Sequence, residues 1–484
     1  MGTISAAFNI ATGALEADES ALNIVANNTA NAGTPGYTLE TPIWQQNDSV
    51  SLNGIRYGTG ASVSGAESQR SLVLERAMQQ QTQTVSASSA RLTALNQIQA
   101  LFSGAAGAGT DANAASGIGT DLTGFFTALS SLEASPADQA EREQVLSAAG
   151  TLASDFNGAA SQLAGQRQSL DDQSTSIVAQ ANTLLRSIAA LNVQIESTSP
   201  DADAGTLEDQ RQQDLTQLSQ LMGINVITTE NNGLTVTTAG GALLVSQGKA
   251  YSMTAGENGG VTDFYDSQGH DITADLTAGG GQLGGTLTAR DQDIPQTEDS
   301  LDTLAFAVAS SINAQNEAGW DLNGSSGAAV FSLPGTVTAA NVTGAASGIQ
   351  LAMTDPAGIA AAGTVAGSSP PVSEGSSGNG NLTAMADLAD QDIVEGTTPT
   401  AYFSDFVTEL GGLVSEVSGE NTAQQAALTQ LQNQIGSLSG VNLNDEAAQL
   451  ETLEQSYEAA SKLFTVLDQA MTSALNLGVE TAYT

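Results

Sequence analysis

Apolar residues recur at alternating steps of three and four near both ends of the chain. Near the beginning the series is Ile4, Phe8, Ala11, Leu15, Leu22 and Val25, interrupted at Asp18. Near the end it is Leu450, Leu453, Tyr457, Ala460, Phe464, Leu467, Met471 and Ala474. This spacing predicts two coiled-coil helices, each with an apolar seam that needs a partner. Either each helix packs separately on the rest of the protein, or residues 1–40 pair with residues 441–484 and then pack against further copies.

A sharp turn should follow the first helix. The asparagines Asn27, Asn28 and Asn31 precede the segment Thr34, Pro35, Gly36 and Tyr37. Asparagine tolerates the left-handed conformations found at helix ends. Proline presets φ at the second position of a tight turn, and glycine accepts the positive φ that a type II turn needs at the third. The helix is therefore predicted to end here.

A much longer helix is predicted in the first half of the chain. Ser135 and Pro136 resemble a helix start, and apolar residues then recur every seventh position. These residues are Phe156, Leu163, Leu170, Ile177, Leu184 and Leu191. A helix that continues to Ser197 would be about 90 Å long. We expect a helical rod from residues 41–223, completed by 286–320 and 386–440.

Short β-prone runs separated by turns follow the long helix. Asn232-Gly233 lies between two such runs and is a strong hairpin signal. Residues 224–285 are predicted to form a β-rich outer domain, together with 321–366, and the Gly/Ser/Pro-rich residues 367–385 a loop. The predicted fold class is α+β and multidomain, with terminal coiled-coil helices, an elongated helical bundle and an inserted β-rich domain.

Composition narrows the possible partners. The chain has 52 acidic and 11 basic residues, a net charge of −41, and no cysteine. This argues against nucleic-acid binding and excludes disulfides and thiolate metal sites. We find no run near the roughly 18 apolar residues that cross a bilayer, and no basic residue ahead of an apolar run in residues 1–30. We therefore expect no membrane insertion and no cleaved signal peptide, so the protein is either cytoplasmic or exported by another route.

Candidate chemistry is sparse, and we expect no catalytic, cofactor or metal site. His270 is the single histidine and falls in a predicted exposed turn. Asp201 and Asp203 resemble the start of a calcium loop, but the twelfth position holds Gln212 instead of glutamate. The glycine-rich residues 279–285 lack the lysine of a P-loop, and we interpret them as a tight connection. The abundant carboxylates leave a glycosidase-type pair open.

Several segments together resemble the axial proteins of the bacterial flagellum. The first are Ala26 to Asn31 with Thr34 to Tyr37, and Gly440 to Ala448 followed by Tyr457. The interior blocks are Leu207 to Val226, Gly281 to Gly285, Arg290 with Asp291, and Ser311 to Asn316. These blocks are similar to the hook-associated protein 1 group, which forms the first hook–filament junction, rather than to hook protein. The resemblance covers nearly the whole chain and is weakest at 325–381.

The resemblance implies a structural role outside the cell, with no catalytic turnover. Members of this group are exported unfolded by the flagellar type III apparatus and form a layer on the distal end of the hook. The implied partners are further copies of the chain, hook protein, the second hook–filament junction protein, and an export chaperone that binds the C-terminal helical region. The implied assembly interface comprises Ile4, Phe8, Leu15, Leu22, Val25, Asn27, Asn28, Asn31, Pro35, Gly36, Tyr37, Leu450, Leu453, Tyr457, Phe464, Leu467 and Met471.

Two alternatives remain at this point. Another flagellar axial protein, such as a hook or rod component, would share both chain ends but lack the blocks at Gly281 and Arg290. An unrelated secreted enzyme or adhesin would require the paired heptad ends to be a coincidence. The ends of this chain also carry fewer basic residues than the family usually shows, so the resemblance supports apolar seams rather than salt bridges.

Overall fold

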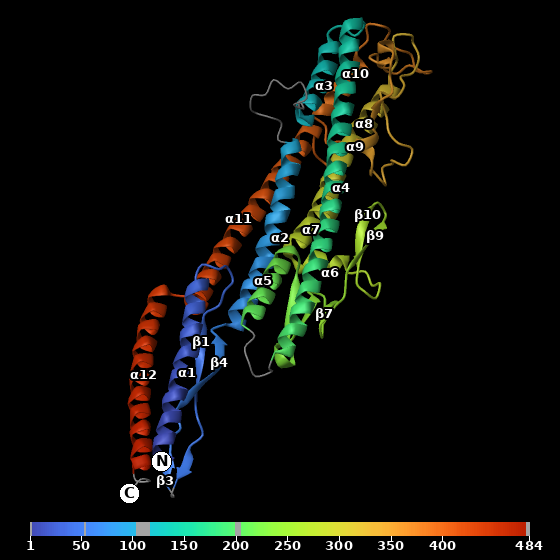
Figure 1. Ribbon diagram of the computed structural model, residues 1–484. Coiled ribbons are helices and arrows are strands. Elements are labelled where there is room, and N and C mark those ends of the chain that lie inside the picture. Colours follow the sequence, from blue (N-terminus) through green and yellow to red (C-terminus); the bar gives the residue numbers. More distant parts are fainter. Residues whose placement is uncertain (1, 53–54, 103–116, 199–204, 481–484) are drawn as a thin grey trace.

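The computed structural model describes residues 2–52, 55–102, 117–198 and 205–480. The molecule is elongated, and the two ends of the chain lie side by side at one end of it (Figure 1). We call this part the terminal module. It contains the helices α1 (Gly2–Asn31) and α12 (Leu443–Glu480) and the strands β1 (Glu40–Gln46), β2 (Val50–Leu52), β3 (Ile55–Tyr57) and β4 (Ala61–Ser68). α1 packs against α12 on one side and against β1 and β4 on another.

Long helices form a rod that continues from the terminal module (Figure 1). They are α2 (Leu72–Phe102), α4 (Gln139–Ser197) and α11 (Pro399–Ser439), joined by α3 (Ile118–Glu133), α5 (Thr206–Leu221) and α8 (Ile294–Ala318). α4 begins later than the Ser135-Pro136 signal suggests. The carboxylate of Asp138 accepts hydrogen bonds from the backbone N–H groups of Ala140 and Glu141 at 2.8 and 3.3 Å, so Asp138 is the N-cap. Ser135 and Pro136 lie in the preceding turn.

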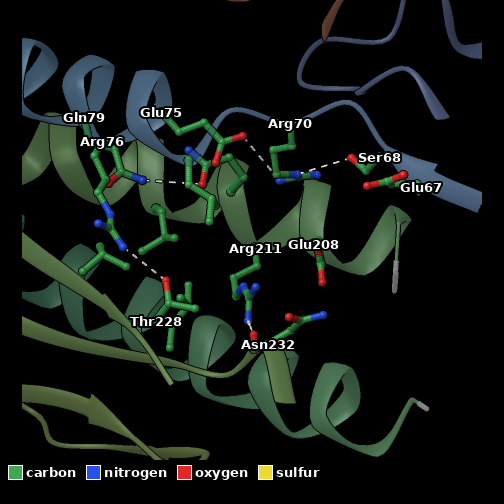
Figure 2. Close-up of a pocket in the computed structure, with 15 residues that line it drawn as sticks. Glu67, Ser68, Arg70, Glu75, Arg76, Gln79, Glu208, Arg211, Thr228 and Asn232 are labelled. Carbon is green, nitrogen blue, oxygen red and sulfur yellow. Dashed lines mark hydrogen bonds and ion pairs between the residues drawn. The ribbon is translucent and has the colours of Figure 1, made fainter. Parts of the chain in front are cut away.

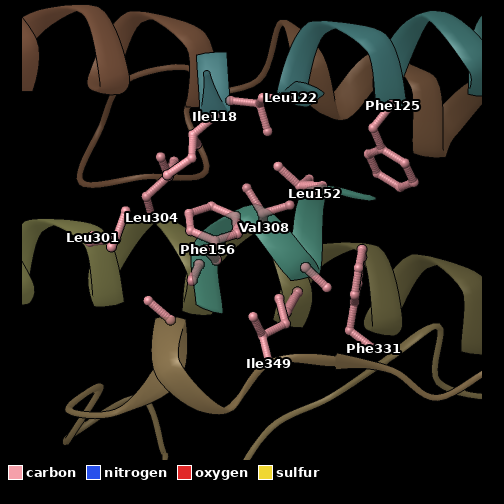
Figure 3. Close-up of a cluster of buried hydrophobic side chains, with 14 of the residues drawn as sticks. Ile118, Leu122, Phe125, Leu152, Phe156, Leu301, Leu304, Val308, Phe331 and Ile349 are labelled. Carbon is pink, nitrogen blue, oxygen red and sulfur yellow. The ribbon is translucent and has the colours of Figure 1, made fainter. Parts of the chain in front are cut away.

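Two hydrophobic clusters stabilise the rod at different heights. The distal core joins α3, the first half of α4, α8 and α11, and Figure 3 shows Phe125, Phe156 and Val308 pointing into it. The second core joins the later half of α4 to α5, the neighbouring sheet and α7 (Gly281–Thr288), and it includes Leu185 and Ile188. Burial of each large apolar side chain contributes roughly 1.5–3 kcal/mol. Each core therefore stabilises its own part of the rod.

A small antiparallel sheet covers the second core in the strand order β5-β6-β7-β8. Its strands are β5 (Ile224–Thr228), β6 (Leu234–Thr238), β7 (Leu243–Ser246) and β8 (Lys249–Ala250). The predicted hairpin is confirmed, because Thr228 lies opposite Leu234 and the connection passes through the 3-10 turn η1 (Glu230–Asn232) with φ 58° at Asn232. A second hairpin joins β9 (Thr254–Asn258) to β10 (Val261–Tyr265).

The structure differs from the predicted rod and outer domain in two places. Residues 40–68 form strands of the terminal module rather than helix, because β1 and β4 pair in antiparallel register from Glu40 opposite Ser68. Residues 273–288 form α6 (Thr273–Gly279) and α7 rather than strands or a tight connection. α7 fills the space between α2 and α4, where a helix buries Leu283 and Leu287. The π-turn η2 (Ala289–Asp293) then leads into α8.

Residues 321–366 also differ from expectation, since they do not extend the sheet. They contribute Phe331 and Ile349 to the distal core. Their short elements are β11 (Phe331–Ser332), α9 (Ala345–Gly348), β12 (Gln350–Leu351) and η3 (Pro356–Gly358). The predicted loop at 367–385 ends in α10 (Gly380–Ala386), which is followed by η4 (Asp387–Ala389). The fold class itself, α+β and multidomain with long terminal helices, is confirmed.

Candidate assembly surface and its joint to the rod

The two predicted seams lie against each other in the terminal module. The rings of Phe8 and Phe464 are 4.5 Å apart between centroids and tilted by 41°. Farther along the pair, α1 buries Ala11, Ala21 and Val25 almost completely. Small side chains at these positions let the neighbouring elements approach closely. The structure thus brings both ends of the chain into one helical pair.

This pair covers its apolar residues only in part. Most of the predicted seam residues are half-buried, namely Ile4, Phe8, Leu15, Leu22, Leu453, Phe464, Leu467 and Met471. Val25 is buried, whereas Leu450 and Tyr457 are exposed. α12 also exposes Leu443, Leu463 and Val466, the last with 61% of its surface accessible. Leu463 and Val466, three positions apart, share one side of α12, and this side presents apolar side chains without cover from the described residues.

A buried asparagine ties the module together near its joint with the rod. The side chain of Asn28, 1% exposed, donates from Nδ2 to the backbone oxygen of Glu40 at 2.8 Å and to Glu446 Oε2 at 3.1 Å. Its Oδ1 accepts hydrogen bonds from the Tyr37 hydroxyl at 2.8 Å and from the Glu40 N–H at 3.1 Å. Both donors and both acceptor positions of the amide are used. We call these residues the Asn28 hub; it links α1, the turn, β1 and α12.

The surroundings of Tyr37 keep its hydroxyl protonated. Burial, followed by the nearby carboxylates of Glu40, Asp209 and Glu446, raises the pKa of Tyr37 to about 12. A phenol with this pKa remains a hydrogen-bond donor throughout the physiological range. The motif tyrosine therefore contributes to the hub as a neutral donor.

The predicted type II turn is confirmed. The N–H of Tyr37 donates to the Thr34 carbonyl at 3.2 Å, and Gly36 has φ 84°. Asn31 Nδ2 donates to the Asn27 carbonyl at 3.0 Å, so these two asparagines finish the helix locally. Asn27, Pro35 and Gly36 are exposed, and Asn31 is half-buried.

The joint between the terminal module and the rod depends on Asp209 in the first turn of α5. Its carboxylate accepts hydrogen bonds from the Thr38 N–H at 3.3 Å and the Thr38 hydroxyl at 3.0 Å, and it forms an ion pair with Arg70. Arg70 also lies 3.7 Å from a carboxylate oxygen of Glu75 on α2. Beside these groups is a cavity of about 430 Å³, whose lining includes Arg70, Glu75 and Arg211 (Figure 2). Burial outweighs the opposing effect of Arg70 and raises the pKa of Glu75 to about 7.

The interior block at Arg290 connects the two cores of the rod. Its guanidinium is fully buried and donates to Asp171 Oδ1 at 2.6 Å, to the Thr262 carbonyl at 2.8 Å and to Asp291 at 2.7 Å. Burial alone would raise the pKa of Asp171, but hydrogen bonds from Thr262 and Arg290 lower it. The resulting buried ion pair joins α4, β10 and the π-turn η2.

The glycine block 281–285 allows α7 to cross its neighbours closely. A Cβ atom on Gly285 would lie 2.0 Å from the Ala87 carbonyl oxygen of α2. A Cβ atom on Gly281, which has φ 71°, would lie 2.4 Å from Met222. These glycines are needed for helix packing rather than for a tight connection.

The remaining candidates for chemistry are considered where the structure describes them. His270 is exposed and its Nδ1 lies 3.0 Å from Asp266. Within the part of the chain that the structure describes, no three histidine, cysteine or acidic side chains are grouped so that they could hold a metal ion. Asp201 and Asp203 lie outside those residues. Of the described helices, none is long and apolar enough to cross a membrane.

Three residues with clear roles at this site were missed in the sequence. Glu446 belongs to a segment that was noted, but its bond to Asn28 spans 418 positions. Asp209 gave no signal beyond an acidic residue near a helix start. Trp44 is 49% exposed and lines a groove between β1 and α12, together with Leu453. Trp44 lies in a strand with an alternating pattern, which was the available signal. It was overlooked because residues 41–223 were expected to form a helical rod.

The chain was compared with known families and relatives. The family model "Flagellar hook-associated protein FlgK helical domain" matches residues 95–331, and "Flagella basal body rod protein" matches residues 8–38. Flagellar hook-associated protein 1 of Salmonella typhimurium is 25% identical, and that of Escherichia coli 26%, each over 98% of this chain and 100% of the relative. The Bacillus subtilis protein is 24% identical over 96% of both chains.

A solved structure has the same fold. The flagellar hook junction protein FlgK from Burkholderia pseudomallei aligns with a TM-score of 0.65 at 20% sequence identity, covering 75% of this chain and 100% of that one. The paired chain ends, the Asn28 hub and the rod thus define a flagellar axial protein. Within that class, the chain belongs to the family of flagellar hook-associated protein 1.

Proposed function

We propose that this protein is a structural component of the bacterial flagellum that forms the junction layer between hook and filament. Family membership over nearly the whole chain supports this role. The protein acts as a mechanical adaptor and catalyses no reaction. It is located outside the cell, in the flagellum.

The observation that carries the assembly mechanism is the half-covered helical pair. α1 buries Val25 and Ala21, whereas α12 leaves Leu463 and Val466 exposed. Several exposed apolar side chains on one helix mark an interaction surface rather than a solvated one. Neighbouring copies bury this side of α12 in the wall of a ring or helical layer, while the rod faces outward.

The partners follow from this arrangement and from the family. The layer contacts hook protein on one side and the second junction protein on the other. Before export, the exposed side of α12 is the surface on which an export chaperone binds. Because the seam lacks full cover in a single copy, α1 and α12 are expected to open locally in the free chain and to become protected on assembly.

Gene deletion tests the role. We expect cells without the gene to carry hooks without filaments and to shed filament protein into the medium, with complementation from a plasmid as the control. Negative-stain electron microscopy of the cell surface gives the readout. Loss of the hook itself would assign the protein to the rod or hook, and unchanged filaments would refute the proposal.

A truncation tests the mechanism separately. Deletion of Asp445 to Thr484 removes most of α12 and leaves all residues of both rod cores in place. We expect the truncated protein to keep a cooperative unfolding transition but fail to join the end of the hook. Normal incorporation of the truncated protein would contradict assembly through the terminal helices.

A further inference from the structure

The connection between the terminal module and the rod is thin. The chain passes between them at residues 69–71, between β4 and α2, and at 440–442, between α11 and α12. Close to these passages, the Leu39 N–H donates to the Ser439 carbonyl at 2.9 Å and the Gln69 N–H to the Leu39 carbonyl at 2.8 Å. Neither short segment is part of a helix or strand, so neither fixes an angle by itself.

Asp209 adds the strongest described contact across this connection. It belongs to the rod through α5, whose Leu215 and Leu218 are buried in the second core. Its three donors come from Thr38, two residues before β1, and from Arg70, two residues after β4 in the connecting segment. Hydrogen bonds from a charged donor to a carboxylate are stronger than neutral ones. One carboxylate therefore holds both strands of the module against the rod.

The surroundings of Asp209 are closely packed on one side and open to a cavity on the other. Gly205 precedes α5 with φ 43°, and a Cβ atom there would lie 2.4 Å from Glu40 Oε1, so β1 approaches the start of α5 closely. On the other side is the 430 Å³ cavity lined by Arg70, Glu75 and Arg211 (Figure 2). That space lets Arg70 move away from Asp209 without a steric clash.

The Asn28 hub lies entirely on the module side of this joint. Asn28, Tyr37, Glu40 and Glu446 all belong to the terminal module. Loss of the contacts to Asp209 would therefore leave the module intact. It would still be attached through residues 69–71 and 440–442 and the Leu39–Ser439 hydrogen bond, about which it could rotate as a unit.

We propose that Asp209 is the positioning residue that sets the angle between the terminal module and the rod. This inference rests on the proposed function: neighbouring copies can align their α12 helices only when their modules hold a common angle. The joint thus has a fixed state, with Arg70 and Thr38 on Asp209, and a free state in which the module swings. The fixed state requires the charged carboxylate of Asp209 and both donor residues, Thr38 and Arg70.

Pairs of spin labels test the proposal directly, because the chain has no cysteine that would compete for labelling. Cysteines at Thr84 on α2 and Glu451 on α12, both exposed, report the distance across the joint by pulsed electron resonance. We expect one narrow distance distribution in the parent and loss of that single peak in Asp209→Ala. Asp214→Ala, on the same helix, is the matched control and should keep the parent distribution.

A second label pair separates rotation from unfolding. Cysteines at Glu19 and Glu454, exposed on α1 and α12, lie within the module and should keep a narrow distribution in Asp209→Ala. An unchanged distribution across the joint in Asp209→Ala would overturn the proposal. So would a parent distribution as broad as that of the variant, or equal broadening of the within-module pair.

The outcome is independent of the junction role. The distances are measured on the isolated full chain, so a failure of the proposed function in the gene-deletion experiment would leave them valid. If the angle matters for assembly, Asp209→Ala should also fail to restore filaments in deleted cells, whereas Asp214→Ala should restore them. Full restoration by Asp209→Ala, with the peak across the joint lost, would refute the link between angle and assembly.

Discussion

The rod and the terminal module bury their apolar residues to different extents. In the rod, Leu152 and Phe156 are completely inaccessible and belong to a core to which α2, α3, α4, α8 and α11 all contribute. In the module, Phe8 and Phe464 contact each other but remain half-buried, and Val466 is mostly exposed. A closed core stabilises a single chain, whereas a half-covered seam is completed only by another chain. Stability and assembly are thus placed in separate parts of the molecule.

Their polar groups differ in the same way. The rod buries arginines: Arg142 donates to the carbonyls of Pro136 and Ile359, both at 2.7 Å, and Arg290 joins the two cores. The module relies on the neutral amide of Asn28 and on Asp209 at its edge. The buried arginines tie distant segments of the rod to one another, whereas the Asn28 hub ties together only elements of the module.

The largest expected effect is that of Arg290→Met. The substitution leaves the partly buried carboxylate of Asp171 without its cation and the Thr262 carbonyl without its donor. Removal of one partner of a buried ion pair costs about 3–5 kcal/mol. Urea unfolding should show this loss, and Arg186→Met, an exposed arginine of α4, should change stability little. A loss equal to that of the Arg186 control would contradict the role of Arg290 between the cores.

A smaller effect is expected at Glu75, and it depends on pH. Burial raises its pKa to about 7 in the folded state, above the ordinary value of 4.5. The folded state therefore binds the Glu75 proton more tightly than the unfolded state does. The stabilisation from protonated Glu75 is fully present below pH 4.5 and is lost as pH rises through 7. Glu75→Gln should stabilise the protein by at most roughly 3 kcal/mol at pH 8 and by little at pH 4.5. Urea unfolding across this range tests it, and a pH-independent difference would refute it.

Substitution of Gly285 should lower the free energy of unfolding somewhat less than substitution of Arg290. Its added Cβ in Gly285→Ala would meet the Ala87 carbonyl oxygen, so α2 and α7 must separate. Overpacking of this kind destabilises by about 1–3 kcal/mol. Gly158 on α4 has open space around an added Cβ, so Gly158→Ala is the matched control and should be neutral or stabilising. Thermal unfolding distinguishes the two; equal midpoints would contradict close packing of α7.

The smallest effect on stability should come from the exposed side of α12. The double change Leu463→Gln and Val466→Gln alters side chains that are 48% and 61% exposed. Such surface changes usually stay within about 0.5 kcal/mol. Filament formation in complemented cells should nevertheless be impaired, whereas Ser461→Gln on the same helix should not affect it. Normal filaments with the double variant would refute the role of this side of α12 in assembly.

Periodicity in the sequence predicted α1, α4 and α12, because each has an apolar seam over most of its length. Pro35 and Gly36 predicted the turn, where only a residue that tolerates positive φ fits at Gly36 without strain. The strands at 40–68 were missed because the runs around Ile43 and Val63 are short and only partly buried. α7 was missed because its glycines give no local sign of a helix. Gly285 and Gly281 are needed for close packing against Ala87 and Met222, which are distant in sequence.

The sequence pointed to the apolar residues of the candidate site and to the turn segment with Asn28 and Tyr37, but not to the distant polar partners of that segment. Ile4 to Val25 and Leu450 to Met471 follow from local spacing. The bonds from Asn28 to Glu446 and from Thr38 to Asp209 join residues that are distant in sequence. Only the folded arrangement of α5, β1 and α12 brings these polar groups together.

Hydrogen exchange of α1 and α12, measured in the free chain and in chains bound to purified hooks, shows whether stability and assembly lie in separate parts of the molecule. Amides of α4 in both cores should exchange slowly in both states. Amides of α1 and α12 should exchange much faster in the free chain and become protected on hooks. Equal protection of α12 and α4 in the free chain, or no gain of protection on hooks, would contradict the separation of stability from assembly.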